Sequence, residues 1–195
     1  MLETDLEMDE KGMTVPYPPF FDDVRKNHGL VDVRGRPELA SQIAEGSDSL
    51  AMRTLLIELA QPNSKIFSVG CDSGTKLLTE EKLPQTAGGY VQIMHATYAD
   101  RSPDDYARYA DAVAETLKAG SQENEWRVHF VLTPVAFKLD GFSDMTGSLW
   151  IWFHAFADSE EGALVSRETL ITELGRALTD DRHTSLLEKS DVCRN

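Results

Sequence analysis

Alternating apolar and polar residues predict four β-strands in the chain. Each segment is rich in Val, Ile, Phe, Tyr or Trp and is bounded by Gly, Pro, Asp or Ser, residues that commonly end strands. The segments span Lys65 to Gly70, Gly89 to Tyr98, Trp126 to Leu139 and Ser148 to Ala157. The stretch 140–147 between the last two has no room for a crossover helix, so we expect these two strands to pair antiparallel.

Apolar residues spaced three or four positions apart predict helices around these strands. The clearest helix lies within 102–120, where Ser102 is the expected N-cap, Pro103 the first helical residue and Gly120 the end. A last helix is expected over about 166–178. Two shorter helices within 37–62 are predicted to form a helical hairpin.

These elements predict an α+β domain built on a mostly antiparallel four-stranded sheet in ββαββα order. The helices are expected on one face, with the helical hairpin before the first strand. Residues 1–36 are acidic, contain the run VPYPPFF and show no clear periodicity, so we expect an extended or disordered arm. Residues 37–180 are predicted to be a single α+β domain, with the hairpin in 37–62 and the sheet with its helices in 63–180, and residues 181–195 a polar C-terminal tail.

The charge of the chain narrows the range of partners. Its 195 residues include 33 acidic and 19 basic side chains, a formal net charge of -14, which argues against direct binding to the phosphate backbone of a nucleic acid. No stretch approaches the ~20 apolar residues of a membrane span, and the acidic N-terminus is unlike a secretory signal. Cys71 and Cys193 form no CxxC pair, which is typical of a reducing compartment. We therefore expect a cytoplasmic protein that contacts no membrane.

The stretch IFSVGCDSGTK, residues 66–76, resembles the glycine turn of S-adenosylmethionine-dependent methyltransferases, which follows a strand and precedes a helix. The matching residues are Val69, Gly70, Cys71 and Gly74. Ser68 stands where that family commonly has an acidic residue, and Asp72 where it has a glycine. The resemblance implies an enzyme that holds a nucleotide-like cofactor at Gly70, Cys71, Asp72 and Gly74. The other interpretation is a tight turn at the end of a strand.

Alternation along the third and fourth strands separates an aliphatic face from an aromatic face. The aromatic face carries the candidate ligand-binding residues His129, Trp150, Trp152 and His154. His95 joins this face only if the second strand has the matching register, which stays open. Two imidazoles from neighbouring strands suggest a metal site, exposed tryptophans suggest a surface for a planar ligand or a protein, and tryptophans covered by the helical hairpin would be core.

These features favour a non-catalytic protein that binds another protein or a small molecule through the aromatic face or the arm, with neither a metal nor a cofactor. No Ser-His-Asp order, phosphate-binding loop or HExxH motif points to catalysis. An enzyme that uses the glycine turn or the histidines is the alternative. A third interpretation is a homodimer that buries Trp150 and Trp152 between its subunits.

Overall fold

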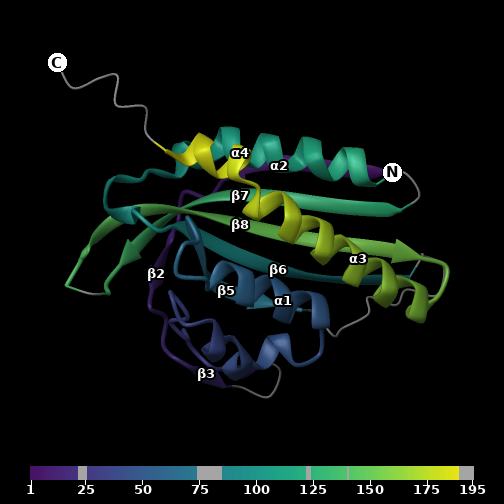
Figure 1. Ribbon diagram of the computed structural model, residues 1–195, viewed down its shortest axis with the longest axis horizontal. Coiled ribbons are helices and arrows are strands. Elements are labelled where there is room, and N and C mark those ends of the chain that lie inside the picture. The colour runs from purple at the N-terminus through teal and green to yellow at the C-terminus, as the bar shows by residue number, and fades with distance from the viewer. Residues whose placement is uncertain (22–25, 74–84, 122–123, 140, 189–195) are drawn as a thin grey trace.

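One six-stranded sheet with helices across one of its faces forms the body of the protein (Figure 1), in a computed structural model that describes residues 1–21, 26–73, 85–121, 124–139 and 141–188. The α+β class predicted from the sequence is confirmed. The long strands are β5 (Ile66–Asp72), β6 (Gln85–His95), β7 (Glu125–Phe137) and β8 (Asp144–Ala157). They are antiparallel neighbours in the order β7-β8-β6-β5, and β7 pairs with β8 as the short connection predicts.

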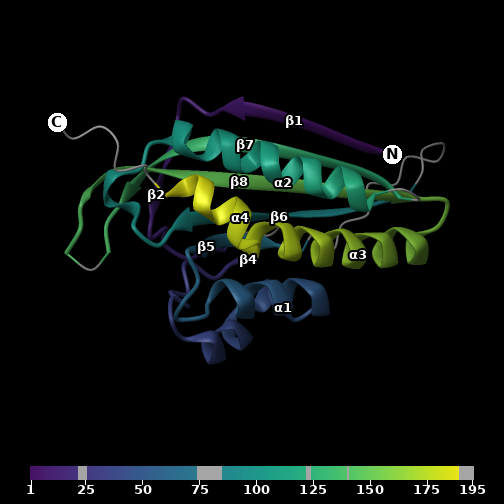
Figure 2. The same cartoon turned by 45° about the horizontal axis from the view of Figure 1, so that its top comes forward.

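The prediction of a four-stranded sheet is wrong because the N-terminal residues add two strands to it. The strands β1 (Leu2–Met8) and β2 (Met13–Val15) both pair parallel with β7, along its free edge. Figure 2 shows β1 beside β7 at the edge of the sheet. The β1 sequence LETDLEM does alternate, with Glu3, Asp5 and Glu7 on one side of the strand. Two further short strands, β3 (Phe20–Phe21) and β4 (Lys26–Asn27), form a separate pair.

The predicted N-terminal helical hairpin is also wrong. Residues 37–46 form two short 3₁₀ helices, Pro37–Gln42 and Ala44–Gly46, and only α1 (Leu50–Leu59) is an α-helix. Short 3₁₀ runs commonly serve as connectors, because their hydrogen-bond geometry is poorer than that of an α-helix. The buried side of α1, which includes Leu55 and Leu59, packs against α3 (Glu160–Thr179). The hairpin region therefore adds to the helical layer and leaves the aromatic face of the sheet uncovered.

The main core lies between the helices and the sheet. The helix α2 (Ala107–Gly120), which follows the 3₁₀ turn Pro103–Tyr106, and α3 cross the same face of the sheet (Figure 2). Trp126 of β7 is 1% exposed there, and its indole Nε1–H donates to Ser166 Oγ at 3.0 Å. After α3 come two short helices, α4 (Asp181–Thr184) and the 3₁₀ turn Ser185–Leu187. Another 3₁₀ turn, Tyr98–Asp100, follows β6.

A second, smaller core covers one end of the opposite face. Val15, Phe67 and Phe137 are buried in it. The Arg34 guanidinium lies 5.1 Å from the centroid of the Phe67 ring and 5.8 Å from that of the Phe137 ring, so the segment after β2 packs over this end. No helix formed by the described residues crosses the rest of that face.

An interruption in the edge strand shapes the border between these two regions. The Asp9 N–H donates to Leu132 O at 2.9 Å, after which the chain leaves β7 and returns only at Met13. Pro134, two residues after Leu132, faces the same edge and has no N–H to offer a neighbour. Gly12 turns the chain back with φ +68. Residues 9–12 therefore do not continue the pairing with β7 and lie at the edge of the open face.

Gly12 is expected to tolerate substitution poorly, because a side chain there would meet both a left-handed backbone conformation and a steric clash with Pro134. A Cβ at Gly12 would lie 2.5 Å from Pro134 O, whereas a Cβ at Gly35, which has a similar φ of +66, meets nothing within 4 Å. Gly35→Ala should therefore cost only the left-handed backbone penalty, about 1 kcal/mol, and Gly12→Ala about 2–3 kcal/mol. Urea denaturation of the two variants measures the difference. Equal losses would mean that the turn shifts away from Pro134 without cost.

Candidate functional site

Residues from four strands line up in rows across the open face of the sheet. The residue opposite Asp5 is His129, the residue opposite His129 is Trp152, and the residue opposite Trp152 is Tyr90. Two parallel rows flank this one. They are Glu3, Arg127, His154 and Gly88, and Glu7, Val131, Trp150 and Gln92. The strand register thus brings the four predicted residues His129, Trp150, Trp152 and His154 together on one surface.

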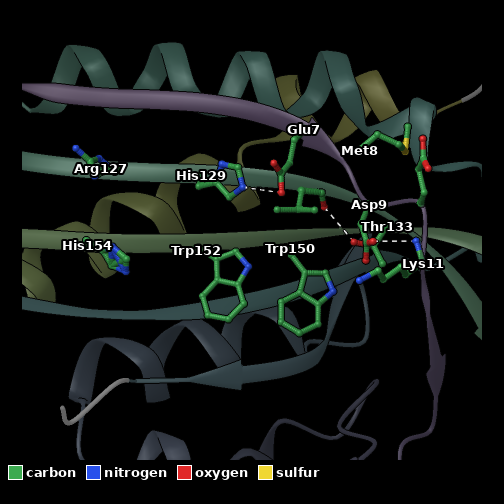
Figure 3. A pocket seen from close by; sticks show the side chains of 12 residues that line it. Glu7, Met8, Asp9, Lys11, Arg127, His129, Thr133, Trp150, Trp152 and His154 are labelled. Atoms are coloured by element: carbon green, nitrogen blue, oxygen red, sulfur yellow. Dashed lines mark hydrogen bonds and ion pairs between the residues drawn. The ribbon is translucent and has the colours of Figure 1, made fainter. Parts of the chain in front are cut away.

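Trp150, Trp152 and Tyr90 form an aromatic platform in the middle of this surface. The two indole rings have centroids 5.4 Å apart and planes inclined by 19°. The Tyr90 ring lies 4.8 Å from the Trp150 ring and 4.7 Å from the Trp152 ring. Figure 3 shows the two indoles side by side with their faces toward the viewer, between His154 and the segment that carries Asp9 and Lys11. Trp152 is 38% exposed, so its ring is open to solvent.

The platform is the floor of a pocket of about 630 Å³. One wall is the end of β1 with the residues pushed out after it, from Glu7 to Lys11. Arg127, His129 and His154 line the remainder. Pockets for small molecules typically enclose about 300–1,000 Å³ and combine apolar surface with a few polar groups. Size and lining therefore both suit a small molecule.

His129 is held between two carboxylates of β1. Its Nδ1 lies 2.7 Å from Asp5 Oδ1 and its Nε2 lies 3.1 Å from Glu7 Oε1 (Figure 3 shows the Glu7 contact). Partial burial lowers the pKa of the imidazole, but the contacts with Asp5 and Glu7 outweigh burial and raise the pKa above its ordinary 6.5. A second ion pair, from the Arg127 guanidinium to Glu3 at 2.7 Å, lies beside it. These pairs hold the edge strand against β7.

The raised pKa of His129 predicts a stability contribution that is lost at high pH. Because the folded-state pKa lies above the unfolded value, the contribution is full below about pH 6.5 and disappears as the pH rises through the folded-state pKa. The partners of His129 are the Asp5 and Glu7 carboxylates. The carboxylates are more than half exposed, so solvent keeps the effect modest.

The measurement is the unfolding free energy of wild type minus that of His129→Gln between about pH 5 and 9. This difference should decline as the pH rises. His154 is the matched control. Burial first and the nearby Arg127 second lower the pKa of its imidazole. Its contribution to the free energy of unfolding should therefore increase as the pH rises to about 6.5, the opposite trend to that of His129. A wild-type minus His129→Gln difference that rises with pH would contradict the ion-pair geometry.

His154 occupies the far end of the pocket as a predominantly neutral imidazole at neutral pH, because its pKa is lowered. Gly88 makes room for the ring: a Cβ on that residue would lie 2.6 Å from His154 Cδ2. A neutral imidazole offers one donor and one acceptor. The His154 ring therefore adds no charge to this end of the pocket, where Arg127 is paired with Glu3.

The glycine-stretch residues that the structure describes do not line the pocket, although Gly70 lies beside Tyr90 of the platform. Gly70, Cys71 and Asp72 are part of β5, which continues two residues beyond its expected end, and Gly74 lies outside the described residues. Cys71 packs partly against the main core. Burial, followed by the charges of Glu45 and Asp72, raises the pKa of its thiol well above the ordinary range. A protonated thiol is a poor nucleophile.

His95, whose position was left open, lies on the side of the main core and not on the open face. It is 5% exposed, its backbone N–H donates to Tyr106 Oη at 2.8 Å, and burial lowers the pKa of its ring. In the part of the chain that the structure describes, no group of three or more His, Cys, Asp or Glu side chains is arranged to hold a metal ion. Within the same residues, no helix has the length and apolarity to cross a membrane.

Three parts of the open face were not identified from the sequence: Tyr90, the edge strand β1 and the segment from Asp9 to Lys11. The apolar-acidic alternation of LETDLEM was the signal for β1. No sequence signal places that strand next to His129, because the two are more than a hundred residues apart.

Comparison of the chain with protein-family models, with curated proteins and with solved structures finds no match. The functional conclusion therefore rests on the fold and the pocket. They define an α+β protein with a helical layer on one face of its sheet and a small-molecule-sized pocket on the other.

Proposed function

We propose that this protein is a non-catalytic binding protein that holds a small planar molecule on the Trp150–Trp152 platform. The observation that carries the proposal is the position of two stacked indole rings, with planes inclined by 19°, at the floor of a pocket of about 630 Å³. A flat ring stacks on such a floor with large contact area on both partners. Each stacked ring contributes about 1–3 kcal/mol in other proteins that bind aromatic groups in this way.

The side chains around the platform favour binding over catalysis. Two cationic groups that line the pocket, His129 and Arg127, are already engaged by carboxylates of β1. His154 has a lowered pKa, and Figure 3 shows the Thr133 hydroxyl and the Lys11 amine, which could act as nucleophiles, at the other end of the platform from it. A concave pocket also suits a small molecule better than the flat surface of a protein partner.

The test is a titration of the purified protein with acridine, a planar three-ring probe, in a buffer that keeps acridine neutral. Stacking on Trp152 should quench part of the tryptophan fluorescence in a saturable way, and calorimetry should give a matching dissociation constant. A cyclohexyl compound of similar size, which has no flat ring system, is the control and should bind more weakly. Absence of saturable binding by acridine and by its charged derivatives, up to their solubility, would refute the proposal.

A further inference from the structure

We infer that the molecule bound on the platform is a planar cation, an aromatic ring system with a protonated or quaternary nitrogen. This inference rests on the proposed function and adds the charge of the ligand. It follows from the balance of charges around the pocket together with the partly exposed indole rings of Trp150 and Trp152.

Carboxylates outnumber cationic groups around the pocket. The carboxylates that line it or pair with its lining residues belong to Glu3, Asp5, Glu7, Asp9 and Glu10. The cationic groups belong to Lys11, Arg127 and, when protonated, His129. The chain as a whole carries a net charge of -14, so the long-range field has the same sign as the local excess.

The ion pairs determine which of these charges remain for a ligand. Arg127 is neutralised by Glu3, and one His129 ring serves both Asp5 and Glu7. Asp9 and Glu10 form no ion pair with any residue that the structure describes, and the Asp9 carboxylate accepts only the backbone N–H of Lys11, at 2.9 Å. Two unpaired carboxylates therefore border the platform at the end where Figure 3 shows Asp9 beside Trp150.

The indole rings at the floor of the pocket also favour a cationic ligand. The face of an indole ring is the negative end of its quadrupole, and tryptophan attracts cations over its face more strongly than tyrosine or phenylalanine does. A flat cation satisfies both parts of the site at once, because its ring stacks on the indoles while its charge lies near the carboxylates. A neutral ring would use only the stacking surface.

Two groups in the pocket favour an anion instead. The Lys11 ammonium has no ion-pair partner among the described residues, and the buried indole N–H of Trp150 finds no acceptor there. These two groups supply one positive charge and one neutral donor. Against them stand the unpaired carboxylates of Asp9 and Glu10 and one further negative charge, because the single His129 ring cannot neutralise both Asp5 and Glu7. The charge balance therefore favours the cation, and an anionic ligand is the alternative that the experiment must detect.

The experiment compares three ring systems of the same shape and different charge. They are 9-aminoacridinium, which is a cation, neutral acridine, and acridine-9-carboxylate, which is an anion. Calorimetric titration of the full chain should rank their affinities in that order, with the cation binding at least about fivefold more tightly than neutral acridine. The advantage of the cation should shrink at high salt, because an exposed charge interaction is screened.

Charge-neutralising variants then locate the effect. Glu10→Gln should weaken binding of 9-aminoacridinium by about two- to fivefold, and Lys11→Gln should strengthen it by a similar factor. Both substitutions should have a smaller effect on the affinity for neutral acridine, because it carries no charge for Glu10 or Lys11 to attract or repel. Glu161→Gln is the matched control, because Glu161 is exposed in the first turn of α3, on the helical side of the sheet.

The outcomes separate the two proposals. Equal affinities for the three probes, tighter binding of the anion, or reversed effects of Glu10→Gln and Lys11→Gln would overturn the inference about charge and leave the proposed function standing. Failure of all three probes to bind would overturn the proposed function itself.

Discussion

Trp126→Ala is expected to destabilise the protein by about 3–5 kcal/mol, whereas Trp152→Ala should cost about 1 kcal/mol. Both residues are tryptophans on neighbouring, paired strands, but they lie on opposite faces. Trp126 is 1% exposed, packs in the main core and donates its N–H to Ser166 Oγ. Its removal leaves a cavity and an unpaired hydroxyl. Trp152 is 38% exposed and loses only its contacts with Trp150 and Tyr90.

Urea denaturation followed by far-ultraviolet circular dichroism measures both effects without relying on the tryptophans as reporters. The comparison tests whether the aromatic face is a surface or part of a core. A loss for Trp152→Ala as large as that for Trp126→Ala would show that the ring is covered in the folded protein, and the pocket could not then bind a ligand.

Removal of both indoles should abolish most of the affinity for a planar ligand. If each stacked ring contributes about 1–3 kcal/mol, the double variant Trp150→Ala/Trp152→Ala should bind acridine at least about thirtyfold more weakly than wild type. Each single variant should retain part of the affinity, because the other indole and Tyr90 still offer a flat surface.

The matched control for this variant is Phe20→Ala. Phe20 is also an exposed aromatic residue, at 55%, but it lies in β3 and does not line the pocket. Acridine affinity should be unchanged in Phe20→Ala. If acridine binds Phe20→Ala poorly and the double variant well, the site lies on the N-terminal segment and not on the sheet face.

Local sequence patterns were sufficient to predict the inner strands of the sheet and the faces to which their side chains point. Alternation in β7 and β8 correctly separated residues such as Phe130 and Ile151, which face the helices, from Trp150 and Trp152, which face the opposite way. The helix that ends at Gly120 was also predicted. In these elements the periodicity, the caps and the tertiary packing all favour the same structure.

The edge of the sheet could not be predicted in the same way. The strand β1 carries three acidic residues in seven, a composition typical of disordered segments, and it is stabilised by partners that the local sequence does not contain. Those partners are the free edge of β7 and the side chains of Arg127 and His129. The predicted helical hairpin failed for a related reason, since the residues before Leu50 pack as short 3₁₀ turns in the tertiary context.

The central claim is that Trp150 and Trp152 form an open binding surface while Trp126 does not. A ¹⁵N-¹H correlation spectrum of the protein should contain one indole N–H signal for each of its three tryptophans, assigned by single Trp→Phe variants. Addition of 9-aminoacridinium should shift the Trp150 and Trp152 signals in a saturable way and leave the Trp126 signal in place. A shift confined to Trp126, or no shift of any indole signal at saturating probe, would contradict the account.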